Sequence, residues 1–145
     1  MNNARYIRYL NFTRRHFFRK TGIWQVVEKE KGNMIVVAQT IRYRRELKFF
    51  DDFSIETRIV CFSDLDKVFY VESRFKDLEG FICAVHYLKY KLVGKDIQSP
   101  SVILDTASGK ASHMWDVATH GTDTNFIAAW NKANSISSEE LNPRM

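Results

Sequence analysis

The stretch Asn2-Asn3-Ala4-Arg5-Tyr6-Ile7-Arg8-Tyr9-Leu10 opens a pattern that runs on to Gly22. An asparagine side chain accepts a hydrogen bond from an amide of the first helical turn, so Asn2 or Asn3 predicts a helix start. Gly22 predicts the helix end. Between them, one side is mainly apolar and another is basic: Tyr6, Leu10, Thr13 and Phe17 against Arg5, Arg8, Arg15 and Arg19. We therefore expect an amphipathic helix with one buried face.

Composition favours a single folded unit with a basic surface. The 145 residues are 45% hydrophobic and 14% aromatic, which is enough for an ordinary packed core. The net charge of +5 is uneven, because residues 1–98 hold 19 basic against 12 acidic residues and residues 99–145 hold 3 against 5. No apolar run is long enough to cross a bilayer, so we expect no membrane span in this chain.

The two cysteines predict a reducing environment. Cys61 and Cys83 lie far apart in strand-like runs and have no metal-type spacing to a histidine. We interpret them as buried free thiols and expect an intracellular, cytoplasmic location.

Four strand patterns follow the helix, at 34–47, 53–61, 68–75 and 81–93. Ser63-Asp64-Leu65-Asp66 and Asp77-Leu78-Glu79-Gly80 predict the turns that join the last three. Taken in sequence order, the strands predict a four-strand meander that packs on the helix. The fold class expected is α+β, with one long helix wrapped by a curved antiparallel sheet.

The composition changes after the last strand, toward Ser, Asp, Thr, Ala and Asn. We therefore divide the chain into a domain at 1–98 and a C-terminal helical extension at 99–145. Thr122-Asp123-Thr124 predicts a cap for a helix at 125–141, with a stripe of Phe126, Ala129, Trp130, Ala133 and Ile136. This helix is expected to pack on the sheet or on a partner subunit.

The opening stretch resembles the start of the central helix in hotdog-fold thioesterases of the 4-hydroxybenzoyl-CoA and acyl-ACP thioesterase type. In that family, an Asp-x-x-x-His-(Met/Val)-Asn-Asn-x-x-Tyr run enters the helix. With Arg42-Tyr43-Arg44-Arg45 and the run from Phe69 to Phe75, this chain looks most like the member 6 group of the thioesterase superfamily. The resemblance implies a hotdog fold, here without its first strand, and a homodimer or higher oligomer with the longer strands in an intersubunit sheet.

Two departures from the family pattern concern the chemistry. The sequence begins at the Met of His-Met-Asn-Asn, so the aspartate and histidine that relatives carry upstream are not in it, and Asn11 stands where many relatives have an acidic residue. We expect either an N-terminally truncated chain or a member without the usual acid/base group. Relatives of this group also carry an anchoring segment upstream, which leaves membrane association of a longer form open.

The resemblance implies thioester hydrolysis at the helix start. Backbone amides at a helix N-terminus stabilise a developing oxyanion, which gives Asn2, Asn3, Ala4 and Arg5 the catalytic position. Tyr6 is the neighbouring substrate-binding residue. Arg42, Arg44, Arg45 and Lys48 are the candidates for the phosphates of coenzyme A, because guanidinium groups grip phosphate in a fork. We expect no metal and no cofactor other than the coenzyme A of the substrate.

Three alternatives stay open beside this prediction. Asn2 and Asn3 can be caps without a catalytic role, and the arginines can form a solvated strand face. Glu46, Asp51 and Asp52 can approach a substrate from a neighbouring subunit or remain solvated turn residues. We expect no nucleic-acid partner, since Tyr6, Tyr9, Phe12 and Phe17 fall at core spacing on a helix enclosed by a sheet. The two function hypotheses are an acyl-CoA or acyl-carrier thioester hydrolase and a non-catalytic acyl-thioester-binding or scaffold protein.

Overall fold

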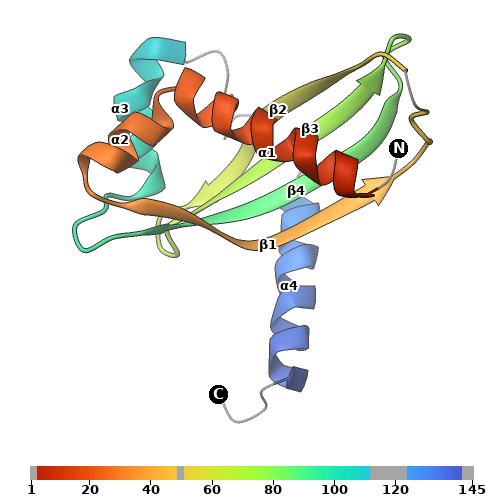
Figure 1. Ribbon diagram of the computed structural model, residues 1–145. Helices are drawn as coiled ribbons and strands as arrows, with labels where there is room; N and C mark the ends of the chain where they lie inside the picture. Colours follow the sequence, from red (N-terminus) through yellow and green to blue (C-terminus); the bar gives the residue numbers. More distant parts are fainter. Residues whose placement is uncertain (1–2, 49–50, 112–123, 142–145) are drawn as a thin grey trace.

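The computed structural model describes residues 3–48, 51–111 and 124–141. Helices α1 (Asn3–Lys20) and α2 (Ile23–Lys29) precede the strands β1 (Asn33–Tyr43), β2 (Phe53–Ser63), β3 (Val68–Asp77) and β4 (Ile82–Val93), and α3 (Pro100–Ala111) and α4 (Thr124–Leu141) follow. Helix α1 crosses one face of the sheet, α2 and α3 lie together at one end, and α4 projects from the other face (Figure 1). The predicted α+β architecture is confirmed.

The four strands form one antiparallel sheet in the order β1-β4-β3-β2. The predicted meander is correct for β2, β3 and β4 and wrong for β1, which pairs with β4 and not with β2. The backbone amides of Arg44 and Arg45 both donate to the carbonyl of Cys83, at 2.7 and 3.1 Å, which ties the end of β1 to β4. The next strand in the chain, β2, lies at the opposite edge of the sheet from β1 (Figure 1).

Register irregularities interrupt all three ladders of the sheet. They fall between Val36 and Ala38 in β1, between Ile59 and Cys61 in β2, and at the end of the β3–β4 pair. An extra residue in one strand bends it and increases its local twist. The sheet therefore curves around α1, as Figure 1 shows.

Two segments differ in local structure from the sequence-based prediction. The strand predicted at 34–47 ends at Tyr43, and Leu47 beyond it is buried under α1. The apolar segment 23–27 belongs to the short helix α2, in which Ile23 and Val27 are completely buried on the same side. Gly22, with φ 82°, ends α1 as predicted and leads directly into α2.

The buried face of α1 is the one predicted. Tyr6, Leu10 and Phe17 are at most 4% exposed, while the four arginines assigned to the other side are exposed. These buried residues belong to two apolar clusters, one around Phe17 at the α2–α3 end of the sheet and one around Tyr6 at the opposite end.

A polar layer crosses the helix-facing side of the sheet between these clusters. His86 is 2% exposed and its Nε2 lies 3.1 Å from Oε1 of Gln39 on β1. Its strand neighbour Ser73 shares a 2.9 Å hydrogen bond with Thr57. Among the described residues, Nδ1 of His86 has no hydrogen-bond partner. Burial, followed by the nearby positive charge of Arg14, lowers the pKa of His86 to about 4.

The opposite face of the sheet carries a buried carboxylate. Glu72 is completely buried and accepts hydrogen bonds from Nε of Arg58 at 3.1 Å, from Arg74 and from the hydroxyl of Tyr87 at 2.8 Å. Burial raises its pKa, but the hydrogen bonds from Arg74, Tyr87 and Arg58 outweigh that effect and the net pKa is lowered. Glu72 is therefore ionised at neutral pH and holds β2, β3 and β4 together on this face.

Helix α3 contributes directly to the main core. Ile103, Leu104 and Ala107 lie in the same apolar cluster as Phe17 of α1 and Val27 of α2. The helix-facing core therefore extends beyond residue 98, although the composition changes there.

The first turns of α4 pack on the outer face of the sheet, as one of the two predicted placements had it. Phe126 stacks on Tyr87 with ring centroids 4.4 Å apart, and Asn131 hydrogen-bonds the hydroxyl of Tyr70. The predicted stripe is largely wrong, because Ile127 is the buried residue and only Trp130 of the predicted set is half-buried. The other four are exposed: Phe126, Ala129, Ala133 and Ile136. Thr122 and Asp123 of the predicted cap lie outside the described residues.

Candidate functional site

The amino end of α1 is open to solvent. The helix begins at Asn3, and Ala4 and Arg5 in its first turn are exposed. Asn2 lies outside the described residues. The first amides of a helix lack intrahelical partners and sit at the positive end of its dipole, so this end can accept an oxyanion. The described first turn therefore has the accessibility that the predicted catalytic position requires.

Tyr6 fixes this helix end to the sheet. Its side chain is 2% exposed, and its ring meets Tyr43 and Phe75 edge-on, each with a centroid distance of 4.9 Å. Burial raises the pKa of Tyr6, and a hydrogen bond with the backbone of Leu47 partly offsets that effect. So little of the Tyr6 side chain is accessible that its described contacts are with the sheet and Leu47, and its predicted contact with the substrate stays a prediction.

Two of the four predicted phosphate-binding cations come together beyond the end of β1. The guanidinium carbons of Arg44 and Arg45 lie 5.0 and 3.8 Å from the centroid of the same ring, that of Phe81. Arg44 also donates to the carbonyl of Ile82 at 3.4 Å, and Arg45 pairs with Asp77 at 3.5 Å. The cation–π contacts and the ion pair hold both guanidinium groups beside the end of the paired strands β1 and β4.

The other two predicted cations are arranged differently. Arg42 lies near the exposed end of β1, and the side chain of Lys48 is exposed beyond the buried Leu47. The backbone amide of Lys48 donates to Oδ2 of Asp51 at 2.7 Å.

Two of the three acidic residues predicted after β1 line a groove along α1 in the same chain. Asp51 and Asp52 border an open groove of about 650 Å³ together with Tyr9, Thr13 and His16. Tyr9 and Thr13 lie one to two turns beyond the first turn of the helix. Asp51 and Asp52 are therefore offset from the helix start, whereas the charge of Glu46 reaches Tyr6 in the first turn and, after burial, contributes to raising its pKa.

The solvent-facing side of α1 carries a second depression, of about 310 Å³. Ala4, Arg8, Asn11 and Phe12 are among its lining residues. Phe12 is 67% exposed, and Tyr9 is 42% exposed, so the prediction that all four aromatics of α1 occupy core positions is wrong for these two. Of these four aromatic residues, Tyr6 and Phe17 lie on the side of α1 that faces the sheet, so the spacing argument is correct for those two.

Sequence reasoning did not find Phe81 or Asp77. Phe81 was assigned to a strand without a role, and Asp77 to a turn. The two residues are joined by a hydrogen bond from the amide of Phe81 to Oδ1 of Asp77 at 2.9 Å. No local sequence pattern predicts that the ring of Phe81 contacts two guanidinium groups, because Arg44 and Arg45 lie 37 and 36 positions earlier in the chain.

The family model of the thioesterase-like superfamily matches residues 1–114. The chain belongs to this superfamily. Protein THEM6 of Xenopus laevis is 32% identical over 142 residues, which are 97% of this chain and 63% of that protein. The chain spans between about half and two thirds of the length of the curated relatives it matches.

Solved structures share the arrangement of helix and sheet. A gentisyl-coenzyme A thioesterase, BH1999, superposes with a TM-score of 0.58 at 23% identity, covering 74% of this chain and 84% of that one. The protein SAV2348 of Staphylococcus aureus, solved in complex with CoA, gives a TM-score of 0.61 at 14% identity, covering 82% and 77%. This member of the thioesterase-like superfamily therefore has the hotdog fold.

No helix in the described ranges is both long and apolar enough to cross a bilayer.

Proposed function

We propose that this protein binds an acyl-CoA or acyl-carrier thioester at the start of α1 and hydrolyses it. The observation that carries the proposal is spatial. The open first turn of α1 and the Arg44–Arg45 pair on Phe81 both lie at the end of the sheet where Tyr6 meets Tyr43. A site for a CoA thioester needs a group that stabilises the oxyanion and cations that bind the phosphates, and the helix end and the two arginines supply these.

In this proposal the residues have separate roles. The amides of the first turn, from Asn3 to Arg5, polarise the thioester carbonyl. The forks of Arg44 and Arg45 hold phosphate oxygens, with Arg42 and Lys48 adding to the positive field. Water attacks the carbonyl carbon and the C–S bond breaks, so the products are a carboxylic acid and the free thiol. Tyr6 holds the helix end in register with the arginines.

We also propose that the protein is a homodimer joined along β1. Among the described strands, β1 pairs on one side only, and Ile35 and Val37 on it are 45% and 50% exposed. A long apolar edge strand is a template for pairing with another copy. The proposal also includes an intracellular, cytoplasmic location and a substrate drawn from lipid metabolism. The free thiols of Cys61 and Cys83 agree with the first.

A second function, acyl-thioester binding without turnover, has its own support. Asn11 lies in the depression beside Ala4 where a carboxylate would serve as a base, and Asp51 and Asp52 line a different groove beside Tyr9. Neither Asn11 nor these two aspartates sets an acid next to the helix start, and of the three acidic residues predicted after β1 only Glu46 acts electrostatically on Tyr6 there.

A hydrolysis assay separates the two functions. Release of free thiol from acyl-CoA substrates of several chain lengths supports the hydrolase, and its absence together with saturable acyl-CoA binding supports the binding protein. If the protein neither binds nor hydrolyses any acyl-CoA or acyl-carrier thioester, both functions are wrong.

A further inference from the structure

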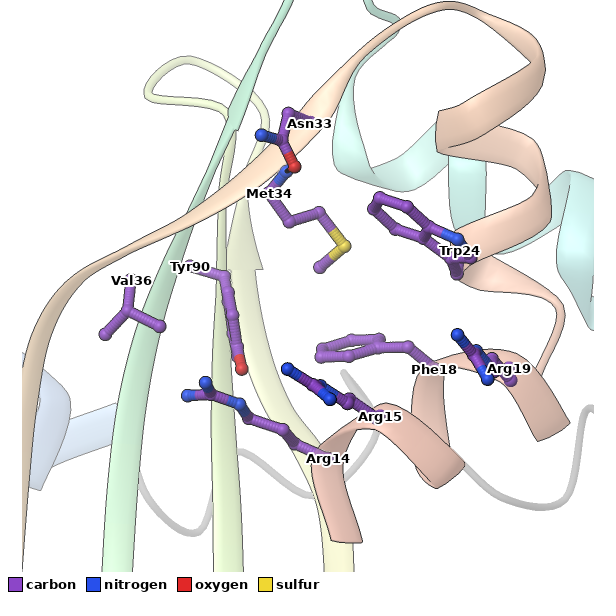
Figure 2. Close-up of a pocket in the computed structure, with 9 residues that line it drawn as sticks. All are labelled: Arg14, Arg15, Phe18, Arg19, Trp24, Asn33, Met34, Val36 and Tyr90. Carbon is purple, nitrogen blue, oxygen red and sulfur yellow. Dashed lines mark hydrogen bonds between the residues drawn. The ribbon is translucent and has the colours of Figure 1, made fainter. Parts of the chain in front are cut away.

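A pocket of about 370 Å³ lies at the carboxyl end of α1, away from the helix start. We call it the Tyr90 pocket. Its walls come from α1, α2, β1 and β4, and they are formed by Arg14, Arg15, Phe18, Arg19, Trp24, Asn33, Met34, Val36 and Tyr90. Figure 2 shows Arg14 and Arg15 extending from α1 toward the hydroxyl of Tyr90, with Phe18, Trp24 and Met34 beside them. This volume is at the lower end of the range for small-molecule sites.

The charged groups of the Tyr90 pocket are all cationic. The pocket contains three guanidinium groups, and no Asp or Glu is among its described lining residues. The guanidinium carbon of Arg14 lies 5.9 Å from the centroid of the Tyr90 ring. Arginine in the last helical turn is favoured by the helix dipole, which accounts for Arg19 but not for Arg14 and Arg15. Three like charges around one concavity repel one another, so an anion would relieve the repulsion.

Tyr90 adds a neutral donor to the same site. The residue is 5% exposed, and burial, partly offset by the charge of Arg14 and a hydrogen bond with it, raises its pKa to about 12. The phenol therefore keeps its proton at physiological pH and can donate a hydrogen bond to an oxyanion.

The rest of the lining is apolar. Phe18 belongs to the buried core, and Trp24, Met34 and Val36 are half-buried side chains packed against that core. A bare inorganic anion would leave this surface facing water, whereas an apolar body next to the anionic group would cover it. Polar and apolar walls together select a ligand with both parts.

We propose that the Tyr90 pocket binds an amphiphile with an oxyanion headgroup, a carboxylate or a phosphate, on a short apolar body. The guanidinium groups of Arg14, Arg15 and Arg19 hold the headgroup, and Phe18, Trp24, Met34 and Val36 cover the apolar part. This site is separate from the Arg44–Arg45 pair and does not depend on thioester hydrolysis.

Four probes test the headgroup and the body by calorimetric titration of the full chain: octanoate, octyl phosphate, octanol and inorganic phosphate. The proposal is supported if octanoate, octyl phosphate or both bind saturably and at least roughly tenfold more tightly than octanol and inorganic phosphate. Comparison of the two amphiphiles shows whether the headgroup is a carboxylate or a phosphate. Equal binding of octanol, equal binding of inorganic phosphate (an adventitious ion only), or no saturable binding of either amphiphile would overturn the proposal.

Variants localise the binding. Arg15 and Arg19 are exposed, so Arg15→Gln/Arg19→Gln should fold normally, and we expect it to bind the preferred amphiphile at least roughly tenfold more weakly. Arg8→Gln, two turns away on the same helix and outside the pocket lining, is the matched control and should bind as the unaltered protein does. Unchanged affinity in the double variant would overturn the assignment.

A spectroscopic readout places the ligand beside Trp24. The amphiphile should change tryptophan fluorescence in the unaltered protein and not in Trp24→Phe, in which Trp115 and Trp130 remain. An equal change in Trp24→Phe, with melting temperatures matched, would place the ligand elsewhere and overturn the proposal. All of these readouts measure binding, so they stand or fall separately from the hydrolysis assay.

Discussion

The rings of Tyr6 and Tyr43 meet edge-on, with centroids 4.9 Å apart and planes inclined by 67°. Tyr6 is in the first turn of α1, and Tyr43 is the last residue of β1. The contact sets the start of the helix beside the point where Arg44 and Arg45 leave the sheet. Aromatic pairs of this geometry contribute about 0.5–1.5 kcal/mol beyond their burial. The proposed thioester site depends on this junction.

Replacement of the arginines on Phe81 should weaken acyl-CoA binding. Arg44 donates to a neutral carbonyl, whereas the carboxylate of Asp77 partly offsets the positive charge of Arg45, so Arg44 should attract a phosphate more strongly. We expect Arg44→Gln to raise KM roughly tenfold with little change in kcat, and Arg45→Gln to raise it less, because the lost contact is made equally in ground and transition states.

The control for this pair is Lys91→Gln, which removes an exposed charge from β4 near the other end of the sheet. Its KM should match that of the unaltered protein. An equal rise in all three variants would mean that net charge, and not the arginine pair, governs binding. If the protein turns out to bind without turnover, the same ranking should appear in the dissociation constants.

A lysine on the exposed edge of β1 should disrupt the proposed dimer. Val37 is 50% exposed at the bulge of this strand, and a charge there opposes edge-to-edge pairing. Light scattering after size exclusion should give a dimer for the unaltered protein and a monomer for Val37→Lys. Val102→Lys, at a 41% exposed position on α3, should remain dimeric. A monomeric unaltered protein, or a dimeric Val37→Lys, contradicts the β1 interface.

Acid should destabilise the fold partly through His86. Its pKa is about 4 in the folded protein against an ordinary 6.5, so the unfolded chain binds more protons between these values. The contribution of His86 to the unfolding free energy is fully present above about pH 6.5, decreases as the pH is lowered, and is lost below about pH 4. A shift of this size corresponds to roughly 3 kcal/mol.

Urea titrations from pH 4 to 7 measure this contribution. His86→Gln should show a shallower dependence of unfolding free energy on pH, while His16→Gln, at an exposed position on α1, should keep the original slope. Identical slopes in all three proteins would show that His86 does not remain neutral in the folded state.

The packing of α4 on the sheet should depend on Ile127 and not on Ile136. Ile127 is 5% exposed against the sheet, and Ile136 on the same helix is 47% exposed. Ile127→Ala should cost about 2 kcal/mol and speed hydrogen exchange in α4. Ile136→Ala should change stability by less than about 0.5 kcal/mol. Equal effects of the two substitutions would argue against docking through the first turns.

Local patterns in the sequence predicted the elements better than their arrangement. The spacing of Tyr6, Leu10 and Phe17 predicted the buried face of α1, because each residue's place on a helix follows from its number alone. The pairing of β1 with β4 was not predictable in this way. Strand periodicity gives faces and not partners, and the partner is chosen by contacts such as that between Arg44 and Cys83.

For the candidate site too, the residues could be predicted from the sequence but their arrangement could not. A helix start and a cluster of arginines are visible in the sequence, so Ala4, Arg5, Arg44 and Arg45 could be named in advance. Their common location at one end of the sheet follows from the Tyr6–Tyr43 contact, which joins residues 37 positions apart. The burial of Ile127 in place of Ala129 was likewise decided by the aromatic residues of the sheet beneath α4.

The central claim, that a thioester is held between the start of α1 and the Arg44–Arg45 pair, is tested most directly by amide chemical-shift mapping with a non-hydrolysable acyl-CoA thioether. The largest shifts should fall on the amides of Ala4 and Arg5 and of Arg44 and Arg45, and Arg44→Gln should weaken the titration while leaving the fold intact. Saturable binding that leaves all four amides unshifted, with changes confined to other parts of the chain, would contradict the account.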